Sequence, residues 1–149
     1  MRTQRLTGEG QQTVLAVLTS GDELLEALGH WAGNASIAFA NFAPLGGLSA
    51  ITFRQFDIVA GKRALPKSID HAVEIVGGSG TISWLGDAPH VHAHLLVSYP
   101  DDSAPEGIVV IGGHVERATC FAVEVVIQAY RGLRIARQPH TGTGLHLWG

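Results

Sequence analysis

Apolar and polar residues alternate along most of the chain, and this period of two predicts a fold made mainly of β-strands. Glycine, proline and small polar residues interrupt the alternation at short intervals, as expected of turns. The predicted strands cover residues 13–18, 36–42, 48–56, 71–76, 81–85, 90–98, 108–111 and 120–129. The predicted turns lie at 44–47, 77–80, 86–89 and 99–107, with an irregular loop within 58–70. For 120–129, where the apolar run is almost continuous, a helix is the alternative.

One segment carries the start and stop signals of a helix. Ser20 and Glu23, three residues apart, form a capping-box sequence in front of the segment 22–28. Gly33 and Asn34 predict the end of this helix. The pattern as a whole therefore predicts a series of β-hairpins with one helix near the N-terminus.

Histidines gather on one of the predicted strands. Residues 89–95 read Pro-His-Val-His-Ala-His-Leu, so His90, His92 and His94 point to one face of the strand and the apolar residues to the other. Second neighbours on a strand lie roughly 6.6 Å apart at their Cα atoms. This spacing suits two imidazoles that bind one zinc ion at about 2.0–2.1 Å from each ring nitrogen.

A further histidine, His114, follows a pair of glycines after the next predicted turn. Residues 95–98 and 108–111 read as the two strands of a hairpin. With the turn centred near 103–104, the numbers of paired residues sum to about 207, which places His114 opposite position 93 and diagonally beside His92 and His94. The pair Gly112-Gly113 also allows a β-bulge, which would change the direction of the histidine.

We interpret His92, His94 and His114 as ligands of a divalent metal ion. Zinc is the first choice because it suits imidazole-only ligand sets, with nickel, copper and iron as alternatives. His90 is then a bystander at the start of the strand, or a hydrogen-bond donor behind the ligands. The competing interpretation is a solvated polar strand face. The remaining histidines are predicted to lie on the surface: His30, His71, His140 and His146.

Composition adds that charged residues are scarce. The chain has 149 residues, enough for one domain with a core, so 1–149 is predicted to be a single domain. Only 15% of the residues are charged and 46% are hydrophobic, which predicts burial of surface in an oligomer.

The lone cysteine, Cys120, lies in an apolar run and reads as a buried, inert thiol in a reducing compartment. Because neither a leader pattern nor a run of membrane-spanning length is present, we expect a soluble, cytoplasmic protein.

The charge balance argues against nucleic acid as a partner. The formal net charge is −3, whereas modules that hold phosphates carry a basic patch or stripe. Direct DNA binding is therefore possible but disfavoured. Two local basic groups are interpreted as solvated surface, one in a loop (Lys62, Arg63 and Lys67) and one in the tail (Arg131, Arg134 and Arg137).

Several stretches together resemble the PPC domain, the plants-and-prokaryotes-conserved domain. They are residues 20–28 (SGDELLEAL), 74–83 (EIVGGSGTIS), the Pro-x-x-His-x-His of 89–94 and the Gly-Gly-His of 112–114. The segment 137–142 (RQPHTG) is also similar to the closing segment of that family. The resemblance covers nearly the whole chain, and the two histidine motifs in this order are its most specific part.

The resemblance implies an α+β fold, mainly antiparallel β-sheet and hairpins with one flanking N-terminal helix, assembled as a homotrimer. It implies that His92, His94 and His114 hold zinc, as the matching histidines do in prokaryotic members. In plants the domain follows AT-hook segments and takes part in transcriptional regulation, so a transcription-associated or DNA-binding role is implied as well. The present sequence has no such hook, because residues 131–134 (RGLR) miss the Gly-Arg-Pro core.

Two functions remain open at this point. The first is a regulatory or ligand-binding module whose metal site shapes a pocket for a small molecule. The alternative is a zinc-dependent enzyme for a small carbonyl or carboxylate substrate, because the family fold is similar to that of acetolactate decarboxylase and three protein ligands leave a coordination position open. Candidates for its acid, base and cation are Glu74, Glu124 and Arg54, for which surface positions or inter-strand pairs are the competing interpretation. The binding module is favoured, because no residue beyond the histidines has an assignable catalytic role.

Overall fold

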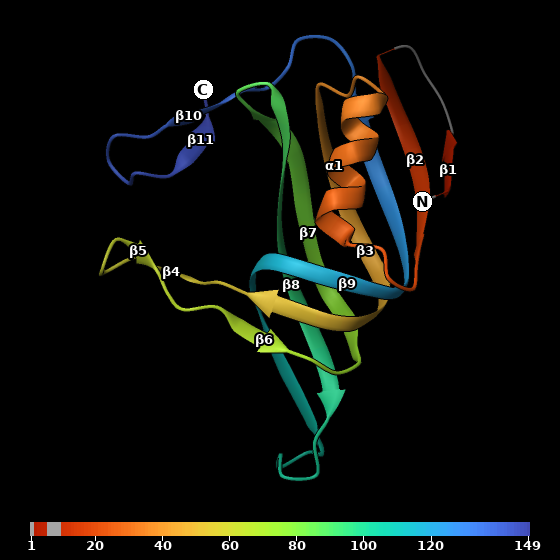
Figure 1. Ribbon diagram of the computed structural model, residues 1–149, viewed down its shortest axis with the longest axis vertical. Helices are drawn as coiled ribbons and strands as arrows, with labels where there is room; N and C mark the ends of the chain where they lie inside the picture. Colours follow the sequence, from red (N-terminus) through yellow and green to blue (C-terminus); the bar gives the residue numbers. More distant parts are fainter. Residues whose placement is uncertain (1, 6–9) are drawn as a thin grey trace.

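The computed structural model describes residues 2–5 and 10–149 (Figure 1). Its elements are β1 (Arg2–Arg5), β2 (Gln11–Thr19), α1 (Leu24–Asn34), β3 (Phe39–Phe53), β4 (Phe56–Asp57), β5 (Lys62–Arg63), β6 (Lys67–Ile69), β7 (Val73–Leu85), β8 (Ala88–Pro100), β9 (Ile108–Tyr130), β10 (Arg137–Pro139) and β11 (His146–Trp148). All pairings between strands in the described ranges are antiparallel. The predicted α+β class, mainly antiparallel sheet with one N-terminal helix, is confirmed.

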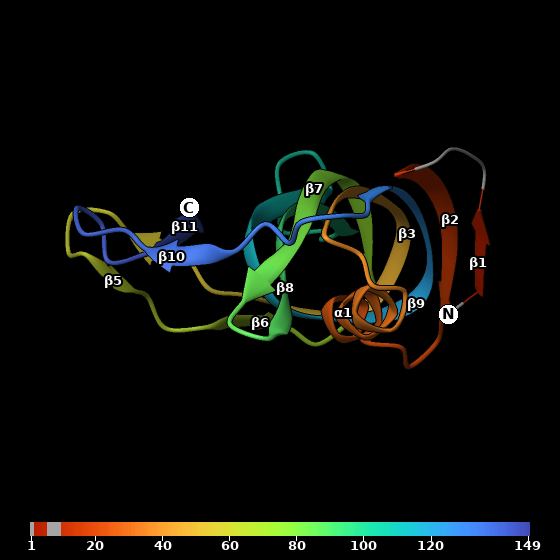
Figure 2. The ribbon, with the colours of Figure 1, turned by 90° about the horizontal axis from the view of Figure 1, so that it is seen from above.

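Seven strands form one sheet that closes on itself. Its order is β1-β2-β9-β8-β7-β3-β6, and β9 also pairs with β3, so that β9, β8, β7 and β3 form a ring (Figure 2). The long strand β9 makes this closure, because its residues 108–114 pair with β8 and its residues 115–130 pair with β3. Two small hairpins, β4–β5 and β10–β11, extend from the same side of the molecule (Figures 1 and 2).

Helix α1 packs on the ring through residues spaced by four. Leu24, Leu28 and Ala32 are fully buried, and the helix contacts β8, β9 and β7. Its end at Asn34 is as predicted, but the predicted capping box is wrong. Glu23 is the N-cap instead, because its carboxylate accepts hydrogen bonds from the backbone N–H of Glu26 at 2.8 Å and of Ala118 on β9 at 2.7 Å. The second bond fixes the start of the helix to the sheet, which a local pattern cannot reveal.

The apolar faces of the strands form a core inside the ring. Phe42, Leu95 and Ile127 are among its largest fully buried side chains. Residues 120–129 are part of β9 and alternate between buried and exposed, so the strand interpretation is confirmed and the helical alternative is wrong. No helix in the described ranges has the length and apolar character needed to cross a membrane.

Two predicted turns, at 44–47 and 77–80, are wrong because β3 and β7 continue through them without reversing. Gly46 has a φ of +127°, and a Cβ atom there would collide with the backbone of Ala122 on β9. The glycine therefore permits a close approach between strands rather than a reversal. The register against β7 shifts between Phe42 and Gly46, and β7 shifts in the same way against β8 between Ile75 and Gly77. These bulges bend the strands into the ring.

Candidate metal centre

Strand β8 presents three histidines on one face, as its alternation predicts. Between them, Ala93 is buried in the core, and Leu95 follows in the same way. On the neighbouring strand β7 the residues paired with His90, His92 and His94 are Ser83, Thr81 and Ser79. Paired residues share a face of the sheet, so each imidazole lies beside a hydroxyl group.

His114 joins this face from β9. It pairs directly with His94, and the pairing runs regularly through Gly112 and Gly113 to Ile108, which pairs with Pro100. The predicted register, with position 93 opposite His114, is therefore wrong by one residue, and the glycine pair makes no bulge against β8. The convergence of the three histidines is nevertheless confirmed, because residues directly opposite each other point to the same side.

Three imidazoles come together at this point. The ring centroids lie 5.1 Å apart for His92 and His94, 4.9 Å for His92 and His114, and 5.4 Å for His94 and His114. One nitrogen from each ring lies within 4.8 Å of the others. Ligands at about 2.0–2.1 Å in a tetrahedral zinc site stand about 3.4 Å apart, so small side-chain rotations suffice to bind one ion. The donor set fits a metal of the zinc type.

The His90 ring lies outside this group, at 6.4 Å from the His92 ring. The other four histidines, His30, His71, His140 and His146, are exposed as predicted. Cys120 is fully buried as predicted, and burial raises the pKa of its thiol to about 12.

The cluster favours neutral imidazoles. Burial first, and nearby cations second, chiefly Arg137 for His92 and Arg63 for His114, together lower the pKa of both histidines to about 4. The pKa of His90 is lowered for the same reasons, burial first and Arg137 second. Because a metal binds the unprotonated ring, His92 and His114 are ready to act as ligands at neutral pH.

Arg137 lies beside the cluster in an environment that the sequence did not predict. It was interpreted as solvated, but only 9% of it is exposed. Its guanidinium donates to Ser83 Oγ at 2.7 Å, to the backbone oxygen of His146 at 2.9 Å and to Thr81 Oγ1 at 3.5 Å. The β10–β11 hairpin, in which Arg137 pairs with Trp148, holds it over β7. The one sequence signal was its place at the start of the family-like segment 137–142.

Arg137 shares one pocket with two of the three histidines, His92 and His94. Its volume is about 510 Å³, and its lining includes His92, His94, Arg137, Thr81 and Trp148. The remaining arginines and lysines of the two predicted basic groups are exposed, as expected: Lys62, Arg63, Lys67, Arg131 and Arg134.

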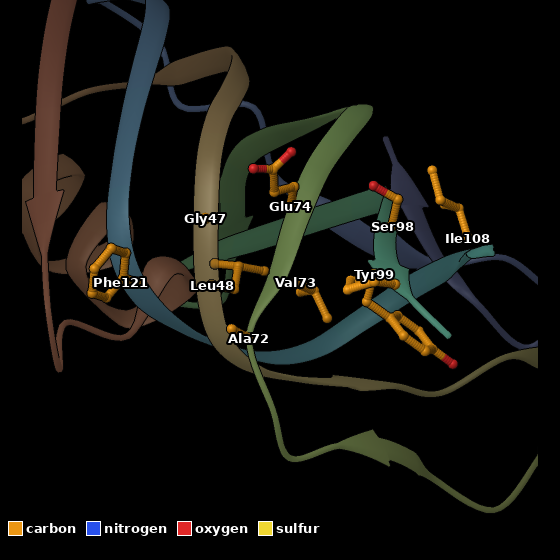
Figure 3. Close-up of a pocket in the computed structure, with 10 residues that line it drawn as sticks. Gly47, Leu48, Ala72, Val73, Glu74, Ser98, Tyr99, Ile108 and Phe121 are labelled. Carbon is orange, nitrogen blue, oxygen red and sulfur yellow. The ribbon is translucent and has the colours of Figure 1, made fainter. Parts of the chain in front are cut away.

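The three candidates for acid, base and cation are not part of the cluster. The Arg54 guanidinium pairs with Glu116 at 2.9 Å, which is the inter-strand pairing that competed with a catalytic role. Glu74 lines a different, mainly apolar pocket of about 500 Å³, which also contains Tyr99 (Figure 3). Glu124 is exposed on β9. Among the described residues, the three histidines are the one group of potential metal ligands.

A closed antiparallel sheet with one flanking helix, and three histidines from adjacent strands, defines a small α+β protein with an imidazole cluster on its sheet. The family is shown by a model that matches residues 5–131, described as the Plants and Prokaryotes Conserved (PCC) domain, which is the PPC domain named above. The chain belongs to this family.

Solved structures have the same fold. A metal-containing protein from Archaeoglobus fulgidus is 24% identical, with 99% of this chain and 98% of that one covered and a TM-score of 0.80. A plant- and prokaryote-conserved protein from Pyrococcus horikoshii is 24% identical, with coverages of 99% and 94% and a TM-score of 0.79. A protein from Ralstonia eutropha JMP134, named as a putative DNA-binding protein, is 28% identical, with coverages of 91% and 90% and a TM-score of 0.78. No curated protein matches the chain.

Proposed function

We propose that this PPC-domain chain, as a single domain of residues 1–149, is a metal-binding protein that holds zinc with His92, His94 and His114. The observation that carries the proposal is the approach of three imidazole nitrogens to within 4.8 Å of one another. The name of the Archaeoglobus fulgidus protein, which is called metal-containing, supports it. An ion held by three protein ligands keeps a position for an exogenous ligand and supplies a Lewis acid there.

The biological role that fits this site best is a regulatory or ligand-binding module. The pocket beside the histidines has the size of a small-molecule site. The described residues bring no carboxylate into the histidine cluster, so the general acid or base of the enzyme alternative has no assigned residue. A screen of small keto and hydroxy acids for zinc-dependent turnover distinguishes the two functions.

The module is proposed to assemble as a homotrimer. Large apolar side chains stand exposed on the outer face of the sheet, including Leu96 at 50%, Val110 at 59% and Phe121 at 66%. Phe121 also lines the apolar groove of Figure 3, together with Ile108, which is exposed as well. Apolar surface of this kind typically marks an interface. Light scattering at micromolar concentration tests this, and a monomeric mass would contradict it.

Metal analysis of protein purified without chelator or nickel resin tests the metal site. We expect about one equivalent of zinc per chain, and its loss in the His92→Ala/His94→Ala double variant. The matched control is His71→Ala/His140→Ala, which removes two exposed histidines and leaves the zinc content unchanged. A metal content well below one equivalent that is equal in all three proteins would refute the proposal.

DNA binding is a second candidate because of the name of the Ralstonia eutropha protein. The net charge of −3 per chain works against it, since a trimer multiplies the repulsion of phosphate. Titration of a labelled duplex at two salt concentrations decides the question. Micromolar binding that weakens steeply with salt would establish DNA as a partner.

A further inference from the structure

Arg137 is a buried charge with neutral partners. Among the side chains of residues 10–149, it is the one charged side chain that is buried. Its three hydrogen-bond acceptors are two hydroxyl oxygens and a backbone carbonyl oxygen. In the same part of the chain the one ion pair joins Arg54 to Glu116 and does not involve Arg137. Because a buried charge is costly without an opposite charge, this arrangement indicates an anion supplied from outside.

The Arg137 guanidinium also has N–H groups that donate no hydrogen bond to the protein. Of its five N–H groups, three are used, one on Nε, one on Nη1 and one on Nη2, and the Nη2 bond is long at 3.5 Å. One further N–H remains on each terminal nitrogen. Two donors on neighbouring nitrogens are the arrangement that binds the two oxygens of a carboxylate.

The position of Arg137 connects these donors with the histidine cluster. Thr81, which accepts from Nη2, pairs directly with His92 across β7 and β8, and paired side chains are about 5 Å apart at their Cβ atoms. His92, His94 and Arg137 line the same pocket, whose remaining wall includes Leu147 and Trp148. A second cation, Arg63, also acts on both His92 and His114. An anion in this pocket therefore meets the charge of Arg137 directly and that of Arg63 in addition.

We propose that Arg137 binds the carboxylate of a small hydroxy or keto acid, with the hydroxyl or carbonyl oxygen of that acid directed to the three-histidine site. The size of the pocket, about 510 Å³, suits a small molecule rather than a polymer. Leu147 and Trp148 offer contact to a short apolar group. This inference rests on the proposed metal-binding function, because the oxygen end of the ligand uses the position that the metal leaves open.

The experiment is a calorimetric titration of the full chain in the oligomeric state in which it is purified. Lactate and pyruvate are titrated separately, into zinc-loaded and into zinc-free protein. Propane-1,2-diol, which has the shape of lactate without the charge, is the matched neutral probe. We expect millimolar binding of the acids, and at least about tenfold weaker binding of the diol, because charge-assisted hydrogen bonds are lost.

Variants separate Arg137 from other charges. Arg137→Gln should weaken lactate binding at least about tenfold. The lactate affinity of Arg137→Lys should lie between those of the wild type and Arg137→Gln, because lysine keeps the charge but loses the paired donors. Arg131→Gln removes the same charge from an exposed position of the same tail and should leave binding unchanged. Far-UV circular dichroism and zinc content show whether Arg137→Gln keeps the fold and the metal site.

Each outcome has a distinct meaning. Zinc in the wild type together with equal lactate affinity in wild type and Arg137→Gln overturns this inference and leaves the metal-binding proposal intact. Equal affinity for lactate and propane-1,2-diol overturns it without the use of any variant. Arg137-dependent lactate binding in a protein that takes up no zinc refutes the metal-binding proposal and keeps Arg137 as the carboxylate-binding residue.

Discussion

Zinc affinity should depend only weakly on pH between pH 7 and pH 5, because two of the three ligands resist protonation. Burial, with Arg137 and Arg63 in second place, lowers the pKa of His92 and of His114 from 6.5 to about 4. Protons compete with the metal for each ring, so each ligand reduces the affinity by the factor 1 + 10^(pKa − pH). Two ordinary imidazole ligands would together lower the zinc affinity about 600-fold between pH 7 and pH 5. Two ligands with a pKa near 4 would lower it only about 1.2-fold.

The assay is competition for zinc against a chromophoric chelator at pH 7, 6 and 5. We expect the total fall between the two ends of the series to stay well below about 600-fold. A fall of about 600-fold or more would mean that at least two ligands titrate as free imidazoles, and would refute the reasoning from burial. His140→Ala, which removes an exposed histidine, is the control and should follow the wild type.

The same two histidines set the sign of the pH dependence of stability in the metal-free protein. Their pKa is lower in the folded chain than in the unfolded chain, so the unfolded state binds more protons as the pH falls. Their contribution to stability is therefore complete above about pH 6.5 and is lost as the pH falls toward 4. The urea midpoint of the metal-free protein should be lower at pH 5 than at pH 7.5, and an equal or higher midpoint would contradict the assigned shifts.

Three further predictions concern residues outside the metal centre. Gly80→Ala should destabilise the fold by about 1–3 kcal/mol in urea denaturation, because the added Cβ would collide with the buried ring of Phe42; unchanged stability would disprove the close packing. Glu23→Ala should cost about 1–2 kcal/mol, measured in the same way, since both the N-cap and the bond to the N–H of Ala118 are lost; a loss close to zero would show that the cap is dispensable. Cys120 should resist iodoacetamide at pH 8 in the folded protein and react in urea, because its thiol is buried and has a pKa of about 12; rapid labelling of the native protein would contradict this.

The histidine face of β8 follows from sequence alone, because side-chain direction along a strand alternates whatever the partner strand is. This local rule placed His92 and His94 together and needed only the hairpin to add His114. The hairpin register could be counted to within one residue, since the chain length of a turn limits the possible pairings. The N-cap at Glu23 was outside the reach of such a rule, because Ala118, one of the groups it binds, lies far along the chain.

The glycine-rich stretches show why the sequence could not predict where strands reverse and where they continue. The residues at 44–47 and 77–80 have the composition of turns, yet β3 and β7 continue through them. A glycine serves equally well in a reversal and at a close approach between strands. Which of the two occurs depends on a neighbour such as Ala122, whose backbone leaves no room for a Cβ at Gly46.

Arg137 shows the same limit for the site itself. Its neighbours in sequence are exposed, and Arg131 and Arg134 lie in the same tail, so the local pattern predicts a solvated side chain. It is buried only because the β10–β11 hairpin carries it onto Ser83 and Thr81 of β7, which are more than fifty positions earlier. The local periodicity of the chain determined which histidines share a face, whereas the packing of distant segments decided which cation lies beside them. The physical reason is that the alternation of side chains along a strand is set by local backbone geometry. The burial of a side chain is set by segments distant in the sequence that pack against it.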